Sequence, residues 1–239
     1  MKRALHEIIE KQLFKGKTIL LFGPRRAGKT YLVSEIIKTY GGRYFNAENF
    51  DVRVQLSTTS LSGMREFVGK ETLVVIDEVQ ELPDAGKKLK VLHDTFPEVQ
   101  FIATGSSAFE MYKGIGDALL GRSRHYKLYP VSYDELRKET SGFDAYVQLE
   151  HLLRFGSYPE VLLSPEADRQ TELLTIAGTY LYKDFEADNQ LRKADIADQI
   201  LRLLAYQIGH QVSLNEIANA TNTTVKTVSR YVQLLEEAF

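Results

Sequence analysis

Short continuous apolar runs alternate with amphipathic stretches from the N-terminus as far as Pro130. A run such as residues 18–22 (TILLF) is typical of a strand that is buried on both faces of a sheet. Five segments are predicted to be strands: Lys17–Phe22, Arg43–Asn46, Thr72–Ile76, Val99–Ala103 and His125–Tyr129. Because helical segments separate these strands, the pattern predicts a three-layer α/β sandwich built on a parallel sheet.

The segments between these strands have apolar residues at helical spacing. In the segment that follows Gly28, for example, Leu32, Val33 and Ile36 share one face of the expected helix. Helices are therefore predicted over residues 1–14, over Thr30–Tyr40, over a polar stretch that ends at Phe67, and over Pro83–Phe96 with Leu89 and Leu92 facing inward.

From Ser132 onward the pattern contains helices and no further strands. The predicted helices are Tyr133–Thr140, Asp144–Phe155 and a long helix from Pro165 to about Leu191. Beyond Asp195, a Ser213-capped helix, a turn at Asn222-Thr223 and the helix VKTVSRYVQLLEEAF form a helix-turn-helix pattern. Its expected buried stripe is Val225, Val228, Val232 and Leu235.

These patterns divide the chain into an α/β core over residues 1–140, a helical lid or linker over residues 141–194, and a winged-helix-like region over residues 195–239. Because Phe239 directly follows a helix, with no wing hairpin, we expect the winged helix to be incomplete.

Composition adds few constraints to this picture. The chain has 239 residues, a formal net charge of −2 and no cysteine, which excludes disulfides, thiol catalysis and cysteine metal sites. No apolar run approaches the roughly 18 residues of a membrane span. Charged residues interrupt any signal-peptide core near the N-terminus, so we expect a cytoplasmic protein without a membrane partner.

One segment joins a predicted strand to a predicted helix and carries strong chemical information. Residues 23–30 read GPRRAGKT, which matches the phosphate-binding pattern G-x-x-x-x-G-K-[ST] in that context. Glycines allow backbone N–H groups to surround phosphate oxygens, and the helix N-terminus adds its positive dipole end. Lys29 is expected to reach the β- and γ-phosphates, and the Thr30 hydroxyl to bind Mg²⁺. The expected nucleotide-binding residues are Gly23, Pro24, Arg25, Arg26, Ala27, Gly28, Lys29, Thr30 and Tyr31.

Two acidic residues follow the third predicted strand. Asp77 is placed to bind Mg²⁺, directly or through water, opposite Thr30. Glu78 is the candidate catalytic residue that polarises an attacking water. A hydroxyl at the end of the next strand would position that water from the γ-phosphate side. Ser106 is the preferred candidate for this role, and Thr104 and Ser107 are the alternatives.

Arginines near the phosphate loop and in the sequence LLGRSR complete the candidate site. Arg122 is the candidate transition-state arginine, in its own protomer or in a neighbour, and such residues contribute ~10³–10⁵ in rate. Arg25 and Arg26 lie inside the loop and are placed to contact phosphates directly. The alternative for Arg122 is a position beside a surface loop.

The segments GPRRAGKT, LVVIDEVQELPD, FIATGSSA, LLGRSRHYKLYPVSYDEL and FGSYPEVLL together resemble one family. It is the group of prokaryotic AAA+-type ATPases that carry a winged helix and a C-terminal domain of unknown function. The resemblance covers essentially the whole chain and implies a sheet with strand order 5-1-4-3-2, followed by an all-helical lid.

The same resemblance implies roles for individual residues. Gly23–Thr30 would bind ATP or ADP, Asp77 the metal and Glu78 the water, and Ser106 would sense the γ-phosphate. Arg122 matches the Gly-Arg that follows the fourth strand in this family. The family's Gly-x-Tyr-Pro-Glu signature is matched by Gly156, Tyr158, Pro159 and Glu160. The nearest match to a lid arginine on the γ-phosphate is Arg192.

These residues predict a Mg²⁺-dependent ATPase whose nucleotide state repositions the lid and the winged helix. An alternative is a nucleotide-gated regulator with little hydrolysis that binds DNA through Lys226, Thr227 and Arg230. Residues 195–239 hold three basic and five acidic residues, a net charge of −2, which disfavours direct DNA binding. Phosphotransfer to a small molecule is disfavoured, because the Asp77-Glu78 pair and the helix-turn-helix suit a hydrolytic switch better. A homo-oligomer, or a protein partner, is also expected.

Overall fold

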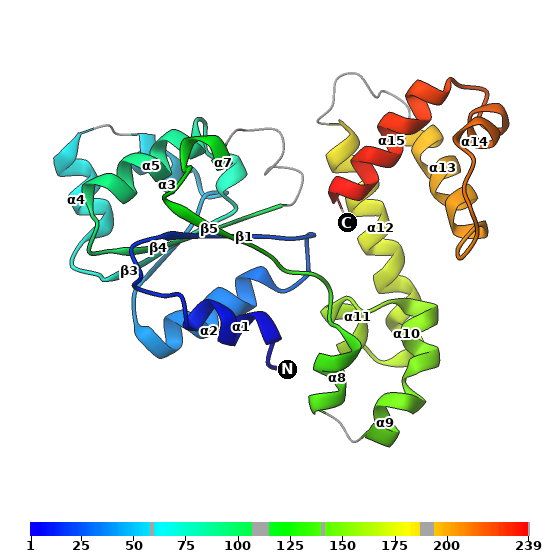
Figure 1. Cartoon of the computed structure of the whole chain (residues 1–239), viewed down its shortest axis with the longest axis horizontal. Helices are drawn as coiled ribbons and strands as arrows, with labels where there is room; N and C mark the ends of the chain where they lie inside the picture. Colours follow the sequence, from blue (N-terminus) through cyan, green and yellow to red (C-terminus); the bar gives the residue numbers. More distant parts are fainter. Residues whose placement is uncertain (58–59, 107–114, 140–141, 187–193, 239) are drawn as a thin grey trace. The chain divides into compact units, whose positions relative to one another are not determined.

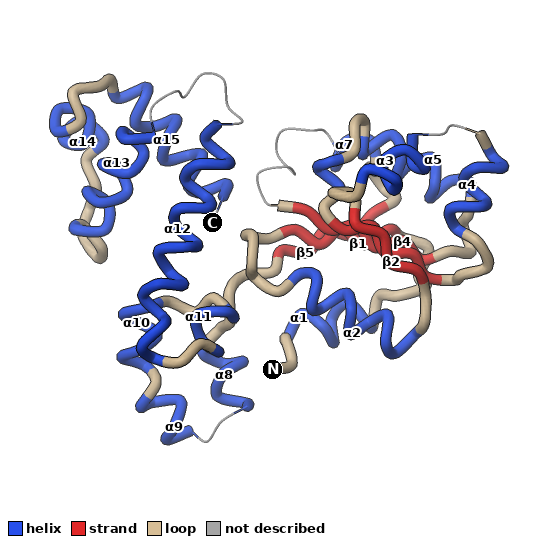
Figure 2. Tube along the Cα trace, turned by 180° about the vertical axis from the view of Figure 1, so that it is seen from behind, coloured by secondary structure: helices blue, strands red, loops and turns tan. Residues whose placement is uncertain are grey.

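The computed structural model of the chain describes residues 1–57, 60–106, 115–139, 142–186 and 194–238. Residues 18–127 contain a five-stranded sheet with the order β2-β3-β4-β1-β5 (Figure 2). The strands are β1 (Thr18–Phe22), β2 (Arg43–Asn46), β3 (Leu73–Asp77), β4 (Gln100–Gly105) and β5 (Ser123–Lys127). Each neighbouring pair is parallel. The fold class and the expected strand order are thereby confirmed.

Helices cover both faces of this sheet, as Figure 1 shows. One face carries α1 (Ala4–Glu10) and α2 (Lys29–Tyr40), and the other carries α3 (Phe50–Ser57), α4 (Leu61–Val68), α5 (Ala85–Thr95) and α7 (Ile115–Ala118). The 3₁₀ helix η1 (Val79–Glu81) follows β3 directly. The apolar positions at helical spacing thus became the inward faces of helices that sandwich the sheet.

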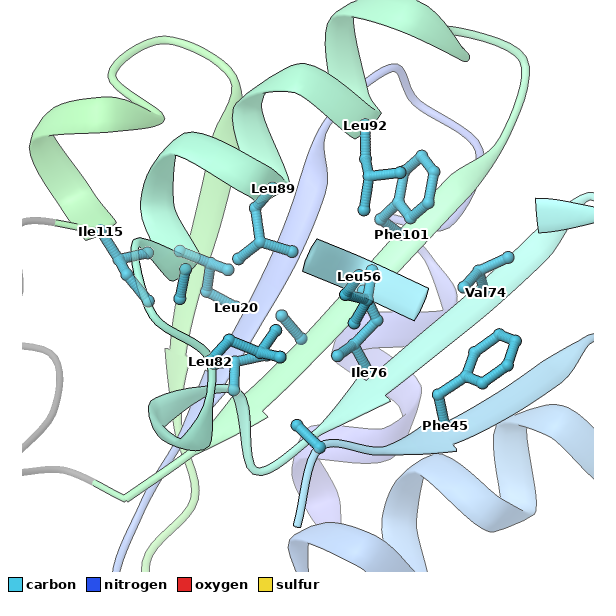
Figure 3. Packing of buried hydrophobic residues seen from close by; sticks show 14 of the residues in the cluster. Leu20, Phe45, Leu56, Val74, Ile76, Leu82, Leu89, Leu92, Phe101 and Ile115 are labelled. Carbon is cyan, nitrogen blue, oxygen red and sulfur yellow. The ribbon is translucent and has the colours of Figure 1, made fainter. Parts of the chain in front are cut away.

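The core lies in two layers because successive side chains of a strand point to opposite faces. Leu20 packs with Leu89 and Leu92 of α5 on one face, as the view of this layer in Figure 3 illustrates. Ile19 packs with Leu32 and other residues of α2 on the other face. All five residues of β1 are buried, and those of β3 and β4 are as well. This complete burial explains why continuous apolar runs mark these strands.

The edge strand β5 differs from its predicted position. The structure places it at Ser123–Lys127, two residues earlier than the predicted segment His125–Tyr129. An edge strand pairs on one side only, and most side chains of β5 remain exposed. Its polar residues therefore lack the apolar run by which the buried strands are recognised in the sequence. The apolar Leu128 is buried after the strand, where its amide donates to the Phe22 carbonyl at 2.7 Å.

Helices form the remainder of the chain: α8 (Tyr133–Glu139), α9 (Gly142–Val147), α10 (Leu149–Phe155), α11 (Pro159–Leu163), η2 (Glu166–Asp168), α12 (Arg169–Glu186), α13 (Ala194–Tyr206), α14 (Leu214–Ala220) and α15 (Val225–Ala238). The predicted helix Asp144–Phe155 is split between α9 and α10. The long helix predicted from Pro165 starts at Arg169, after a 3₁₀ turn.

The chain divides into two compact units, Met1–Leu162 and Leu163–Phe239. In the second unit, α13, α14 and α15 pack around a core that includes Ile200, Ile217, Val228 and Tyr231. The described residues of this unit contain helices but no strand, so they show a helix-turn-helix without a wing. The three-segment division expected from the sequence stays a prediction.

The helix-turn-helix confirms the predicted cap and corrects the predicted stripe. The Ser213 hydroxyl accepts a hydrogen bond from the Glu216 amide at 3.4 Å, as an N-cap should. However, Val225 is 40% exposed, whereas Tyr231 is only 2% exposed. The buried face therefore runs through Val228, Tyr231 and Leu235 and begins one turn later than predicted.

Candidate functional site

The phosphate loop occupies the turn between β1 and α2. Arg26 and Gly28 have left-handed backbones, with φ of 59° and 96°, which fold the chain back into the helix. Gly23 is required for a steric reason, because a Cβ atom there would lie 2.2 Å from the Leu128 carbonyl oxygen. The loop and the segment that follows β5 are thus packed backbone to backbone, which only glycine allows.

Lys29 turns its side chain into this loop. Its Nζ donates to the carbonyl oxygens of Gly23 and Pro24, each at 2.9 Å, and the residue is 4% exposed. Burial lowers the pKa of Lys29, while the carboxylates of Glu78 and Asp77 act in the opposite direction. An ammonium group held by carbonyl oxygens of the loop is placed to exchange these contacts for phosphate oxygens.

Asp77, the last residue of β3, is the centre of the polar contacts at the carboxyl edge of the sheet. It is 2% exposed, and its Oδ2 accepts a hydrogen bond from the Thr30 hydroxyl at 2.8 Å. The Tyr44 hydroxyl of β2 donates to the same oxygen, and the Thr104 hydroxyl of β4 donates to Oδ1. Burial, followed by the bond to Asp77, raises the pKa of the Tyr44 phenol. Hydroxyl groups from three separate segments therefore converge on one carboxylate.

Glu78 follows in a left-handed backbone conformation, with φ of 55°. Its amide donates to the Thr104 hydroxyl at 3.2 Å. Its carboxylate accepts a hydrogen bond from the Gln80 side chain, whose oxygen in turn accepts from the Ser106 amide at 3.4 Å. Gln80 thus links the candidate water-polarising residue to the end of β4.

These contacts distinguish the hydroxyl candidates at the end of β4 from one another. Thr104 is fully buried and its hydroxyl bridges Asp77 to the Glu78 amide. Ser106, the preferred candidate, contacts this network through its backbone amide to Gln80. Ser107 lies outside the described residues, as does Arg192. The role of Ser106 at the γ-phosphate stays a prediction.

Arg122 is not brought together with the other candidates in its own protomer. It directly precedes β5, and Ser123 pairs in register with Thr18, the first residue of β1. The phosphate loop follows the last residue of β1, so Arg122 lies at the opposite edge of the sheet. There its Nε pairs with Asp94 Oδ1 at 2.7 Å. This position does not suit action on a phosphate in its own protomer; action on a neighbouring protomer stays a prediction, and a position beside a surface loop stays the alternative.

Arg3 and Glu135 support the phosphate loop, and neither residue was predicted from the sequence. The Arg3 guanidinium donates to the carbonyls of Ala27 at 2.7 Å and Tyr129 at 2.6 Å, and it pairs with Glu135 at 3.1 Å. Glu135 also accepts from the amides of Ala4 and Ser132. The spacing Ser132-x-x-Glu135 is that of a capping box and was the available signal.

The other missed residues are Tyr44 and Gln80. Tyr44 lies in a strand that is adjacent to β3 in space only, so no local pattern identifies its contact with Asp77. Gln80 lies two residues after Glu78, where the left-handed backbone turns the chain back. A glutamine in a short polar segment carries no distinctive signal by itself.

The Gly-x-Tyr-Pro-Glu segment lies beside the phosphate loop. Glu160 Oε2 accepts from Arg26 Nη1 at 2.9 Å, and Pro159 Cγ lies 3.8 Å from the position of a Cβ on Gly28. The Ser157 carbonyl accepts from the Val131 amide at 2.9 Å. Tyr158 is largely buried, which raises the pKa of its phenol to about 12. The signature thus contacts the loop that precedes it by more than a hundred residues.

The remaining candidates lie on the surface. Tyr31, the first residue after Thr30, is 52% exposed. In the second unit, Lys226 is exposed in the first turn of α15, Thr227 shares a hydroxyl hydrogen bond with Thr224, and Arg230 approaches Gln233 at 3.4 Å. None of the described helices is long and apolar enough to cross a membrane.

The family comparisons agree with this geometry. A family model described as an AAA domain matches residues 15–137, which is just over half of the chain. A second model, described as a domain of unknown function (DUF8612), matches residues 146–239. The AAA+-type resemblance of the sequence motifs is thereby confirmed.

Two uncharacterized relatives match nearly the whole chain. An uncharacterized protein of Methanocaldococcus jannaschii is 24% identical over 261 residues, which cover 99% of this chain and 58% of that protein. An uncharacterized protein of Mycobacterium bovis is 26% identical over 239 residues, or 100% of this chain and 50% of that protein. The chain therefore spans about half the length of the curated relatives it matches.

Among solved structures, the Walker-type ATPase of Pyrococcus abyssi matches with a TM-score of 0.65. The match has 17% sequence identity and covers 99% of this chain and 89% of that chain. At this identity the likeness establishes a common fold.

Proposed function

The chain belongs to the AAA domain family, and we propose that it is a Mg²⁺-dependent ATPase that works as a nucleotide-driven switch. The observation that carries the proposal is the convergence of the Thr30 and Thr104 hydroxyls on Asp77, next to the buried Lys29. A phosphate loop, a lysine inside it and an acidic residue at the end of a neighbouring strand are the parts that P-loop NTPases require.

The donor set fits a magnesium ion that arrives with a nucleotide. Magnesium takes oxygen ligands and is usually held by one or two carboxylates, waters and substrate phosphates. Thr30 and Asp77 offer a hydroxyl and a carboxylate that already touch. Among the described residues no group of three or more His, Asp or Glu side chains could hold a metal alone, which agrees with a shared protein–nucleotide site. When bound, the ion would neutralise charge that develops on the phosphates.

The other residues have distinct tasks in this proposal. Lys29 exchanges its two carbonyl contacts for the β- and γ-phosphate oxygens. Glu78 accepts a proton from the attacking water, and Thr104 holds the backbone of Glu78 in place. Helices α10 and α11, which precede the second unit, are the first part of the lid whose position depends on the nucleotide.

Thermal unfolding with Mg-ATP, Mg-ADP and Mg-GTP tests the nucleotide site. A ligand at about 100 times its dissociation constant stabilises the folded state by about 2.7 kcal/mol. We expect this stabilisation with adenine nucleotides in the wild type and its loss in Lys29→Ala. An unchanged Tm with every nucleotide would contradict the proposal.

Phosphate release tests hydrolysis separately. Glu78→Gln should bind Mg-ATP as the wild type does but release no phosphate, because an amide cannot accept the proton from water. Glu81→Gln is the matched control, since Glu81 is an exposed acidic residue of the 3₁₀ helix that directly follows Glu78. Equal rates in the wild type and Glu78→Gln would refute the assigned role of Glu78.

A second candidate function is nucleotide-gated DNA binding with little hydrolysis. The observation in its favour is that Lys226 is exposed on α15, while Val228 and Tyr231 of the same helix are buried. Duplex binding that weakens with salt and with Lys226→Ala or Arg230→Ala would support it. The absence of duplex binding with either nucleotide would remove it.

A further inference from the structure

Arg26 occupies a position in the phosphate loop from which its side chain can reach a bound nucleotide. Its left-handed backbone lies between Gly23 and Gly28, the two glycines that define the loop. A guanidinium group is the side chain best suited to phosphate, because its planar fork forms two parallel hydrogen bonds. In the structure this guanidinium contacts a carboxylate.

That carboxylate is Glu160, and the contact is weak enough to be exchanged. The Arg26 and Glu160 side chains are 32% and 47% exposed, and their closest atoms are 2.9 Å apart. Ion pairs at such exposed positions have small free energies because water solvates both partners. A nucleotide carries several negative charges on its phosphates, so it can compete successfully with a single exposed carboxylate for one arginine.

The residue before Glu160 also lies against the loop. Pro159 Cγ is 3.8 Å from the position that a Cβ on Gly28 would take, so the start of α11 borders the phosphate site on a second side. Val161, in the middle of α11, is completely buried. The same helix ends at Leu163, where the second unit begins. The residue that contacts Arg26 thus lies in the same short helix as the boundary between the two units.

We propose that Glu160 regulates the phosphate site by competing with the nucleotide for Arg26. In the free protein Glu160 holds Arg26 away from the loop centre. Bound phosphates take over the guanidinium, which releases Glu160 and the start of α11. The inference rests on the proposed function and adds to it the contact through which the nucleotide state is passed on.

A double-mutant cycle of nucleotide affinity tests this competition. The dissociation constant of Mg-ADP is measured by calorimetry for the wild type, Glu160→Gln, Arg26→Gln and the double variant. We expect Glu160→Gln to bind about threefold to fivefold more tightly, the range of a weak exposed ion pair. Arg26→Gln should bind more weakly, and in that background Glu160→Gln should have no effect.

The matched control is Glu150→Gln, which removes the same charge from an exposed position on α10. It should leave the Mg-ADP affinity unchanged. If Glu160→Gln tightened binding equally with and without Arg26, the effect would be that of the general electrostatic field, and the competition would be refuted. An unchanged affinity in Glu160→Gln would also refute it.

Hydrogen exchange of the peptide that covers residues 159–163 gives an independent readout. Mg-ADP should accelerate exchange there in the wild type and should not do so in Arg26→Gln. Slower or unchanged exchange in the wild type would overturn the proposal. A wild type that binds no nucleotide would instead refute the proposed function, so the two failures are distinguishable.

Discussion

The side-chain amide of Gln80 donates a hydrogen bond to the carboxylate of Glu78. The same amide group accepts a bond from Ser106, so it fixes Glu78 relative to the end of β4. We expect Gln80→Ala to lower the rate of phosphate release about tenfold, a part of the ~10²–10⁴ that a positioned general base contributes. The dissociation constant of Mg-ADP should stay within about twofold, because the hydrogen bonds of the Gln80 side chain join it to Glu78 and Ser106 and not to the phosphate loop.

Gln80→Glu keeps the size of the side chain but turns the donor into a second acceptor. It should therefore lose as much activity as Gln80→Ala while it unfolds at nearly the wild-type temperature. Turnover equal to that of the wild type in both variants would show that Gln80 does not position Glu78.

A methyl group at Gly23 should disrupt the phosphate loop. Its Cβ would lie 2.2 Å from the Leu128 carbonyl oxygen, far inside van der Waals contact. Gly23→Ala should lower the free energy of unfolding by several kcal/mol, beyond the ~1 kcal/mol of a typical substitution. Gly178→Ala in α12 is the control, because a Cβ added there would have no neighbour within 4 Å. That change should stabilise the helix by about 0.5–1 kcal/mol. Denaturant unfolding measures both variants.

Removal of Arg3 should destabilise the fold far more than removal of its neighbour Lys2. Arg3 is buried and bonded to Glu135, and loss of one partner of a buried ion pair costs about 3–5 kcal/mol. The ion pair of Lys2 with Glu7 is exposed to water, so its loss should change the stability much less. Chemical denaturation of Arg3→Ala and Lys2→Ala compares the two. Equal losses would contradict the supporting role of Arg3.

Glu135 should make the stability depend on acidic pH. Burial raises its pKa, but hydrogen bonds from Ser132 and Ala4 and the pairing with Arg3 outweigh this and lower the pKa below 4.5. As the pH falls, the Glu135 carboxylate is therefore protonated in the unfolded chain before it is protonated in the folded protein. The stabilisation of the folded state by the ionised Glu135 is complete above pH 4.5 and is lost as the pH falls through the pKa of the folded state. Glu135→Gln should unfold with a flatter dependence on pH between about 5 and 3. The slope of unfolding free energy against pH is the measurement.

Arg122 should be dispensable for nucleotide binding by a single protomer. It pairs with Asp94 at the edge of the sheet opposite to the phosphate loop. Arg122→Ala should therefore keep the Mg-ADP-induced rise in Tm and lose turnover only at concentrations at which the chain self-associates. Arg124→Ala, which removes an exposed arginine of β5, is the control. Loss of the Mg-ADP effect in Arg122→Ala would contradict this placement.

Sequence patterns were most informative where a property is local. Strands β1, β3 and β4 are buried on both faces, so apolar runs identify them almost to the residue. Strand β5 is paired on one side only, and its predicted position was two residues late. The predicted stripe of α15 included Val225, which is 40% exposed, and left out Tyr231, which is 2% exposed, because a tyrosine has both apolar and polar character.

The sequence by itself determined the phosphate loop, the buried strands and the identities of Lys29, Thr30 and Asp77. These follow from backbone conformation and from residues that are close along the chain. Only the tertiary structure decided that Arg3 supports Ala27, that Glu160 contacts Arg26 and that Arg122 lies at the far edge. Such contacts join residues separated by long crossover connections, and a polar side chain is compatible with many partners until packing brings one within hydrogen-bonding distance.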